Sequence, residues 1–227
     1  MKTIFKFCAA AVLVISTANS AFAADTADLK VQGTLIMGSC TPTLSSGGVV
    51  DFGKISVGSL NTADVNQLGT KEITLTLTCK SPTKVAWVAT DDRSDSVVDT
   101  KPVTGTEAAP FTTDEFGLGK TVGGVKLGSY ALLAANKEEP VVDGAQGHVG
   151  FSDDDAATWT AGSGAGTYSH GDGSRLITFV DTTGIPVAFT TASDILRVGA
   201  SIQDSTTLAI TDDTPLDGQA TISVKYL

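Results

Sequence analysis

Two cysteines, Cys40 and Cys79, are the side chains of this sequence with the most clearly defined chemistry. In an exported protein an isolated pair most simply forms a disulfide, and this one would close a loop of about 40 residues. A disulfide that closes a loop of this length stabilises a fold by about 4 kcal/mol in the chain-entropy model. The alternative, a metal site, would need further ligands, and the sequence has neither a Cys-x-x-Cys pair nor clustered histidines. We therefore predict a disulfide between Cys40 and Cys79 and no metal site.

Several other motifs suggest chemistry at first reading, but none meets the requirements of its site. Gly117–Thr121 resembles the end of a phosphate-binding loop without its first glycine, and Gly162–Gly166 lacks the strand-to-helix setting of a dinucleotide site. Asp153–Asp155 lacks the alternating ligand spacing of a calcium loop. The two histidines, His148 and His170, fit no zinc pattern, and no Gly-x-Ser-x-Gly nucleophile motif is present. We expect a protein that is not an enzyme and has no cofactor.

The first 23 residues have the features of a cleaved export signal. Lys2 and Lys6 precede an apolar run, Phe7–Ala18, that is too short to span a bilayer. Ala21–Ala23 then places small residues at the two positions that a signal peptidase reads. Cleavage after Ala23 would remove two lysines from a chain whose formal net charge is already −10. So acidic a protein is not expected to bind nucleic acid or an anionic membrane face.

The stretch after the predicted cleavage point alternates between apolar and polar residues. Its apolar or glycine positions are Ala27, Leu29, Val31, Gly33 and Leu35. This period of two is typical of a strand that buries one face. Because chain termini are normally polar and frayed, we interpret residues 24–36 as an arm made for another molecule's sheet. The bland alternative is an ordinary first strand of the protein's own fold.

Further alternating segments separated by turn residues predict an all-β fold. The clearest is Lys71–Cys79, which places Cys79 on its buried face, and Lys84–Thr90 is a strand with Trp87 in the core. Val49–Ile55 and Thr206–Ile210 are also expected to be strands. The spacing fits a single sandwich of two antiparallel sheets over residues 37–227.

The carboxyl end, Gly218–Leu227, is the last alternating strand. The positions on one face are Ala220, Ile222, Val224 and Tyr226. The mature chain therefore both begins and ends with an amphipathic segment.

These features, taken in order, carry a resemblance. Gly33 ends the first part of an alternating arm, Cys40 follows it by seven residues, Cys79 ends an alternating strand, and Tyr226 is next to last. The chain resembles the pilin subunits of Gram-negative chaperone–usher fimbriae. The match covers both ends and the two cysteines, and it leaves residues 91–173 largely unmatched.

The resemblance implies an incomplete immunoglobulin-like sandwich, which lacks its last strand and receives one from another molecule. Residues 24–36 would be the donor arm, with Leu29, Val31 and Leu35 in groove pockets and Gly33 where the groove is shallow. Ala220–Tyr226 would be the acceptor edge, which a periplasmic chaperone also holds before assembly.

The function implied by this resemblance is that of a structural subunit of a surface fimbria that contributes to cell adhesion. Its partners would be other fimbrial subunits, a periplasmic chaperone and an outer-membrane usher, on a route through the periplasm to the cell surface. The alternative is an exported lectin-like or adhesive module at a fibre tip, which would bind a host glycan or protein through residues 91–173.

Overall fold

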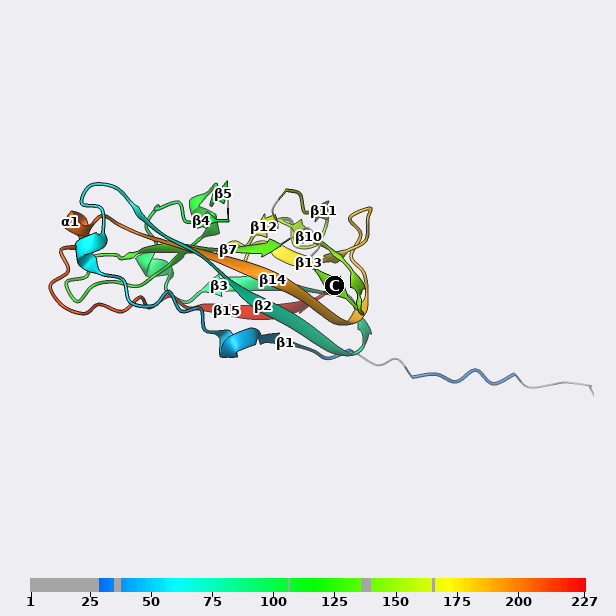
Figure 1. The fold of residues 1–227 in the computed structure, drawn as a ribbon. Helices are drawn as coiled ribbons and strands as arrows, with labels where there is room; N and C mark the ends of the chain where they lie inside the picture. The colour runs from blue at the N-terminus through cyan, green and yellow to red at the C-terminus, as the bar shows by residue number, and fades with distance from the viewer. Residues whose placement is uncertain (1–28, 35–37, 106, 136–139, 165) are drawn as a thin grey trace, which may run out of the picture. The chain divides into compact units, whose positions relative to one another are not determined.

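The computed structural model describes residues 29–34, 38–105, 107–135, 140–164 and 166–227, and it is all-β apart from short helical turns (Figure 1). The predicted export signal and the arm positions Ala27 and Leu35 lie outside these residues. The chain divides into two units, residues 1–36 and residues 37–227. We call the second unit the body.

Sheet A of the body is antiparallel, in the order β1-β2-β14-β7-β12, with β6 also on β7 and the β8–β9 hairpin beside β14. Its strands are β1 (Cys40–Leu44), β2 (Asn66–Thr83), β6 (Glu115–Gly117), β7 (Gly128–Ala135), β8 (Val141–Val142), β9 (Ala145–Gln146), β12 (Gly166–Tyr168) and β14 (Phe189–Ile202). The long central strands β2 and β14 pair over most of their length.

Sheet B is antiparallel in the order β11-β10-β13-β3-β15, so the last strand of the chain is at its edge. Its strands are β3 (Val85–Asp91), β10 (His148–Ser152), β11 (Thr160–Ala161), β13 (Leu176–Val180) and β15 (Ala220–Tyr226). A separate two-stranded hairpin joins β4 (Val103–Thr104) to β5 (Glu107–Ala108).

Helical structure in the described residues is limited to single turns. These are the 3-10 turns η1 (Ser45–Gly48), η2 (Val57–Ser59), η3 (Ser94–Ser96) and η4 (Thr112–Asp114), and the α-helix α1 (Ser205–Leu208). No helix in this part of the chain is long and apolar enough to cross a membrane.

The core forms where the alternating strands of the two sheets face each other. On β2, Ile73, Leu75, Leu77 and Cys79 are all buried, which confirms the predicted face of Lys71–Cys79. Trp87 of β3 lies in the same core with 1% of its surface exposed, as predicted. A period of two places these side chains on one side of each strand, so packing two such faces buries both.

The other face of sheet A is covered by residues 97–105 and 107–109, and polar contacts help to hold this cover. Gly199 of β14 approaches it so closely that an added Cβ would lie 2.1 Å from the carbonyl oxygen of Val103. Ser129 Oγ donates to the carbonyl of Val98 at 2.6 Å, and the amide of Thr100 donates to Glu115 at 3.1 Å. The cover is held by these hydrogen bonds together with a small apolar cluster of Ala109, Ala131, Leu133 and Tyr168.

Two predicted strands are not strands in the structure. Val49–Ile55 has no strand partner among the described residues, because Asp51 accepts the amide of Gly53 at 2.7 Å and Gly53 has a φ of 72°. This local turn bends the backbone away from a ladder.

The prediction for Thr206–Ile210 was also wrong, since α1 occupies its first half. The Asp204 side chain accepts the Thr207 amide as an N-cap, and Ala209 ends the turn in the left-handed region. Capping chemistry thus overrode the alternating pattern here.

Candidate strand-binding groove

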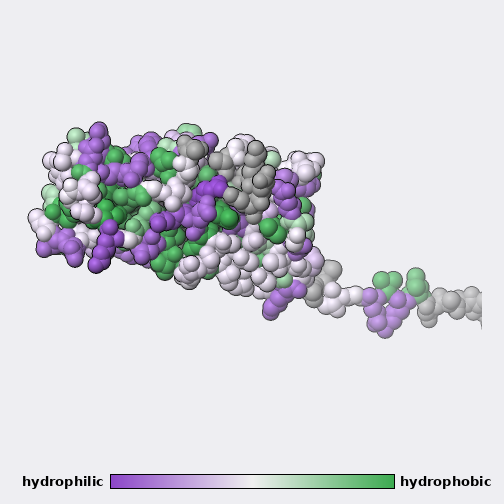
Figure 2. All heavy atoms as spheres, viewed as in Figure 1, coloured by the Kyte–Doolittle hydropathy of each residue, from purple (hydrophilic) through white to green (hydrophobic). Residues whose placement is uncertain are grey.

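An apolar groove lies between the two sheets on the side where β1 and β15 form their edges. It contains two adjoining cavities of about 230 and 250 Å³. The first is lined by Leu44, Gly48, Val50, Phe52, Ile73, Leu118, Tyr130, Leu132, Leu196, Val198, Leu216, Gly218, Gln219, Ala220 and Ile222. The second is lined by Pro42, Thr43, Leu44, Gly47, Gly48, Leu75 and Ile222. Figure 2 shows hydrophobic side chains at the surface on the face where Figure 1 places β2, β14 and β15.

The groove has no ionisable side chain on its walls apart from one tyrosine, among the residues that the structure describes. That residue is Tyr130, whose pKa is raised by burial, so its phenol stays neutral. Tyr130 stacks on Phe116 with ring centroids 5.2 Å apart. Such walls favour an apolar occupant over a charged one, because a charge placed here would lose its hydration without gaining a partner.

One wall of the groove is a strand edge that is ready to pair. β15 is antiparallel to β3, and the amide of Leu227 donates to Lys84 while the carbonyl of Gln219 accepts from Asp92. Main-chain direction alternates along a strand, so the N–H and C=O groups of the even positions point away from β3. These positions also carry the half-buried side chains Ala220, Ile222 and Val224.

The other wall is much less able to pair. In β1 the carbonyl of Ser39 accepts from Lys80 of β2, so the groups of Cys40, Pro42 and Leu44 point away from β2. Pro42 has no N–H to donate. The amide of Cys40 already donates to the phenol oxygen of Tyr226 at 2.9 Å.

The far edges of both sheets are short, in contrast to β15. Sheet B ends there in β11, which has two residues, and sheet A in β12 and β6, which have three each. Short edge strands are one way in which proteins avoid unwanted pairing. The seven residues of β15 are therefore the long sheet edge that the body leaves open.

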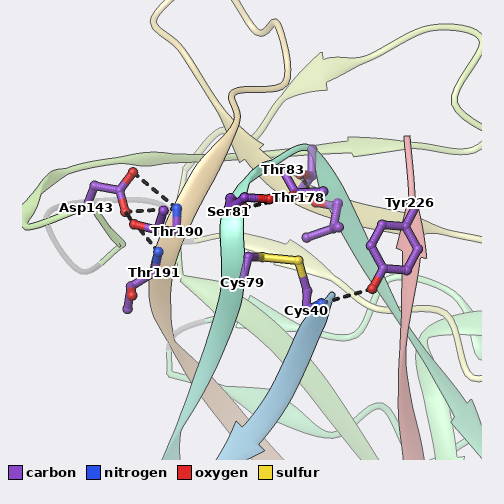
Figure 3. The surroundings of a disulfide bond; sticks show 10 residues. Cys40, Cys79, Ser81, Thr83, Asp143, Thr178, Thr190, Thr191 and Tyr226 are labelled. Atoms are coloured by element: carbon purple, nitrogen blue, oxygen red, sulfur yellow. Dashed lines mark hydrogen bonds between the residues drawn. A yellow bond between two sulfur atoms is a disulfide. The ribbon is translucent and has the colours of Figure 1, made fainter. Parts of the chain in front are cut away.

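The disulfide fixes one end of the groove. Cys40 and Cys79 are bonded, and they stand opposite each other in the β1–β2 pair, as predicted (Figure 3). Figure 3 also shows the ring of Tyr226 reaching from β15 to the backbone of Cys40. Gly38 lies against Thr83, where an added Cβ would be 1.8 Å from the hydroxyl oxygen. The chain thus enters β1 along β2.

The predicted donor positions that the structure describes are exposed and belong to no strand. Leu29 and Val31 have 90% and 86% of their surface exposed, and Gly33 is exposed as well. Exposed aliphatic side chains at alternate positions are a hydrophobic surface without a partner inside residues 29–34.

The three consecutive aspartates considered as a calcium site make contacts within the protein. Asp153 forms two hydrogen bonds with Arg175, Asp154 accepts from Ser152 and Thr158, and Asp155 pairs with Lys225. Within the described residues, no three His, Cys, Asp or Glu side chains are grouped to hold a metal ion.

A carboxylate–imidazole–hydroxyl series is present around His170, and no motif in the sequence indicated it. Ser174 Oγ lies 2.8 Å from Nδ1 of His170, and the buried carboxylate of Asp114 lies 3.4 Å from Nε2. Burial lowers the pKa of His170, and burial raises that of Asp114. The Gly173 amide donates to the His170 carbonyl, so residues 170–174 form a tight turn, and neither His170 nor Ser174 lines the groove. We interpret the contact between the His170 and Ser174 side chains as a structural link that closes this turn.

Sequence reasoning missed the groove wall formed by Val50 and Phe52, which pack against the core. The segment was predicted as a strand, and no inward face was assigned to Val50 or Phe52. Leu118 and Leu216 line the groove from loops and carry no periodic signal.

Comparisons with known proteins point to one family. A family model described as "Protein of unknown function (DUF1120)" matches residues 29–131. The "Uncharacterized protein YhcF" of Escherichia coli K12 is 38% identical over 228 residues, which cover 92% of this chain and 94% of that protein. "Protein GltF" of the same strain is 32% identical over 241 residues, which cover 92% of this chain and 92% of that protein.

Proposed function

The chain belongs to the DUF1120 family, together with YhcF and GltF of Escherichia coli, and from this premise we propose that it is a structural subunit of a surface fimbria. In this proposal each subunit receives a strand in its groove and gives its arm, residues 24–36, to a neighbour. The body is then an immunoglobulin-like sandwich without its last strand.

One observation carries the proposal: the long bare edge of β15 borders a groove with apolar walls. A strand laid beside β15 would satisfy its outward N–H and C=O groups and fill the groove with alternate side chains. Side chains on one face of a strand recur about every 6.6 Å, and the arm and β15 both have apolar residues at this spacing. The groove and the arm are therefore complementary in chemistry and in period.

The energies are of the right size for a durable noncovalent link. Leu29, Val31 and Leu35 would each contribute about 1.5–3 kcal/mol when buried. Each ladder hydrogen bond adds about 1 kcal/mol net, and part of the sum is offset by ordering the arm. Because the contact is spread along a whole strand, the loss of one hydrogen bond or one side-chain contact would not separate the two subunits.

Val50 and Phe52 also line the groove, on a segment that has no strand pairing in the described residues. Their side chains would add apolar contacts to an incoming strand.

An open edge beside an apolar groove also requires protection before assembly. This supports a chaperone that covers β15. Export to the periplasm and an outer-membrane usher where subunits exchange complete the proposal.

The test compares two substitutions of equal charge on opposite faces of the arm. Val31→Asp changes an apolar donor position, and Gln32→Asp changes its polar neighbour. We expect Gln32→Asp to polymerise like the unsubstituted mature chain and Val31→Asp to remain monomeric, as measured by light scattering after release from the chaperone. A stable monomer in all three proteins would contradict the proposal and favour the adhesive module.

A further inference from the structure

We propose that Tyr226 closes the groove at one end and thereby sets the register of the strand that enters it. The inference rests on the proposed function, since it takes the occupant to be residues 24–36 of a second copy. It adds a specific role for one side chain, which is to stop the incoming strand.

The lining of the groove ends before the last residues of β15. Both cavities include Ile222, and neither includes Val224 or Tyr226. β1 contacts β15, and a hydrogen bond links the two strands at Tyr226, four residues beyond Ile222. The groove lining runs from Leu216 and Gly218 to Ile222, and Tyr226 stands beyond its end.

The closure is a direct link between the sheets. The phenol of Tyr226 accepts the Cys40 amide at 2.9 Å, which joins β15 of sheet B to β1 of sheet A (Figure 3). Tyr226 is 45% exposed, so it lies at the surface and not in the core.

Both sides of this link are held in place. Cys40 is tied to β2 by its disulfide, and the neighbouring Ser39 carbonyl accepts from Lys80 at 3.0 Å. On the other side Tyr226 pairs with Val85, and the amide of Leu227 donates to Lys84 at 3.1 Å. A strand that passed between β1 and β15 here would have to break the Tyr226–Cys40 hydrogen bond and displace the ring of Tyr226.

The consequence is a limit on the register at one end of the groove. An incoming strand can use the outward groups of Ala220, Ile222 and Val224, but at the next even position the ring of Tyr226 crosses its path. A shift of two residues keeps the apolar face inward, so periodicity alone would allow several registers. Tyr226 removes those that extend past Val224.

Disulfide trapping measures the register directly. The acceptor is the mature chain with Val31→Asp, which removes its own arm as a competitor, and with Ser223→Cys on the exposed face of β15. The probes are three peptides of residues 24–36 with a cysteine at Lys30, Gln32 or Thr34. We compare Tyr226, Tyr226→Phe and Tyr226→Ala, with Val224→Ala as a matched control, and quantify products by mass spectrometry.

With Tyr226 present we expect one peptide to give most of the product. Tyr226→Ala should raise the product of a second peptide, whose cysteine is two residues from that of the favoured peptide. The ratio of the second product to the favoured one should rise at least tenfold. Tyr226→Phe, which keeps the ring and loses the hydrogen bond, should fall between. Val224→Ala should lower the total yield and leave the ratio unchanged.

Two results would overturn the inference in distinguishable ways. The same product ratio with Tyr226→Ala would mean that the phenol does not set the register, while strand binding itself stands. No product above that of a scrambled peptide, with Tyr226 in place, would refute the proposed function and the inference together.

Discussion

Replacing Glu115 by glutamine should remove a large pH dependence from the stability of the body. The Glu115 side chain is fully buried under the cover formed by residues 97–105 and 107–109. One of its oxygens accepts the Thr100 amide at 3.1 Å, and the nearest cation, Lys101, is 3.9 Å from the other. Burial, reinforced by the nearby Asp99 carboxylate, raises the pKa of Glu115 to about 7 from its ordinary 4.5.

The sign and size of the effect follow from this shift. The folded protein holds the Glu115 proton more tightly than the unfolded chain does. The carboxyl therefore stabilises the fold fully below about pH 4.5 and loses this contribution as pH rises through about 7. At about 1.4 kcal/mol per pH unit, the rise corresponds to about 3 kcal/mol. Glutamine keeps the shape and the acceptor for Thr100, and it carries no charge at any pH.

Urea unfolding between pH 5 and pH 8.5 measures the effect as a difference between two proteins. The measured quantity is the free energy of unfolding of Glu115→Gln minus that of the unsubstituted chain. We expect this difference to be about 3 kcal/mol larger at pH 8.5 than at pH 5. His170 and Asp114 titrate in both proteins and cancel in the comparison. Glu107→Gln, at an exposed glutamate of β5, is the control. A difference that does not change with pH would refute the reasoning, because Glu115 would then be ionised in the fold.

Three further predictions follow from single residues. Gly33→Leu should slow or block polymerisation and leave chaperone binding near normal, measured by fibre yield and by pull-down, because only the donor arm changes; normal fibre yield would contradict the proposed place of Gly33. Cys40→Ser should lower the free energy of unfolding by about 4 kcal/mol and impair folding more than exchange, whereas two free thiols in periplasmic material would remove the premise. Gly199→Ala should destabilise the body by about 1–3 kcal/mol in urea unfolding, since the new Cβ would lie 2.1 Å from the Val103 carbonyl; unchanged stability would mean that residues 97–105 pack loosely.

Several elements of the fold could be predicted from the sequence because the signal for them is local. The alternation of Lys71–Cys79 gave its buried face, Trp87 was placed in the core, and β15 follows the alternation at the carboxyl end. A period of two states which side chains share a face wherever the segment lies. The cysteine pair likewise needed only the identity of its residues and the expected compartment.

Other features depend on contacts between distant parts of the chain, and the sequence could not supply them. Val49–Ile55 has the pattern of a strand, yet no neighbour in the described residues pairs with it. Glu115 looks like any surface glutamate until residues 97–105 and 107–109 cover it, and only then does its pKa rise.

The sequence by itself determined that this protein is built from alternating strands, that Cys40 and Cys79 can be joined, and that its two ends are amphipathic. Only the tertiary structure decided that β15 lies at an open edge, that an apolar groove adjoins it, and that Tyr226 reaches Cys40 across 186 residues of sequence. The physical reason is that periodicity fixes the direction of side chains within a strand, whereas an edge strand is one that has a neighbour on one side only. Which strand has no second neighbour is decided by how all the other strands pair.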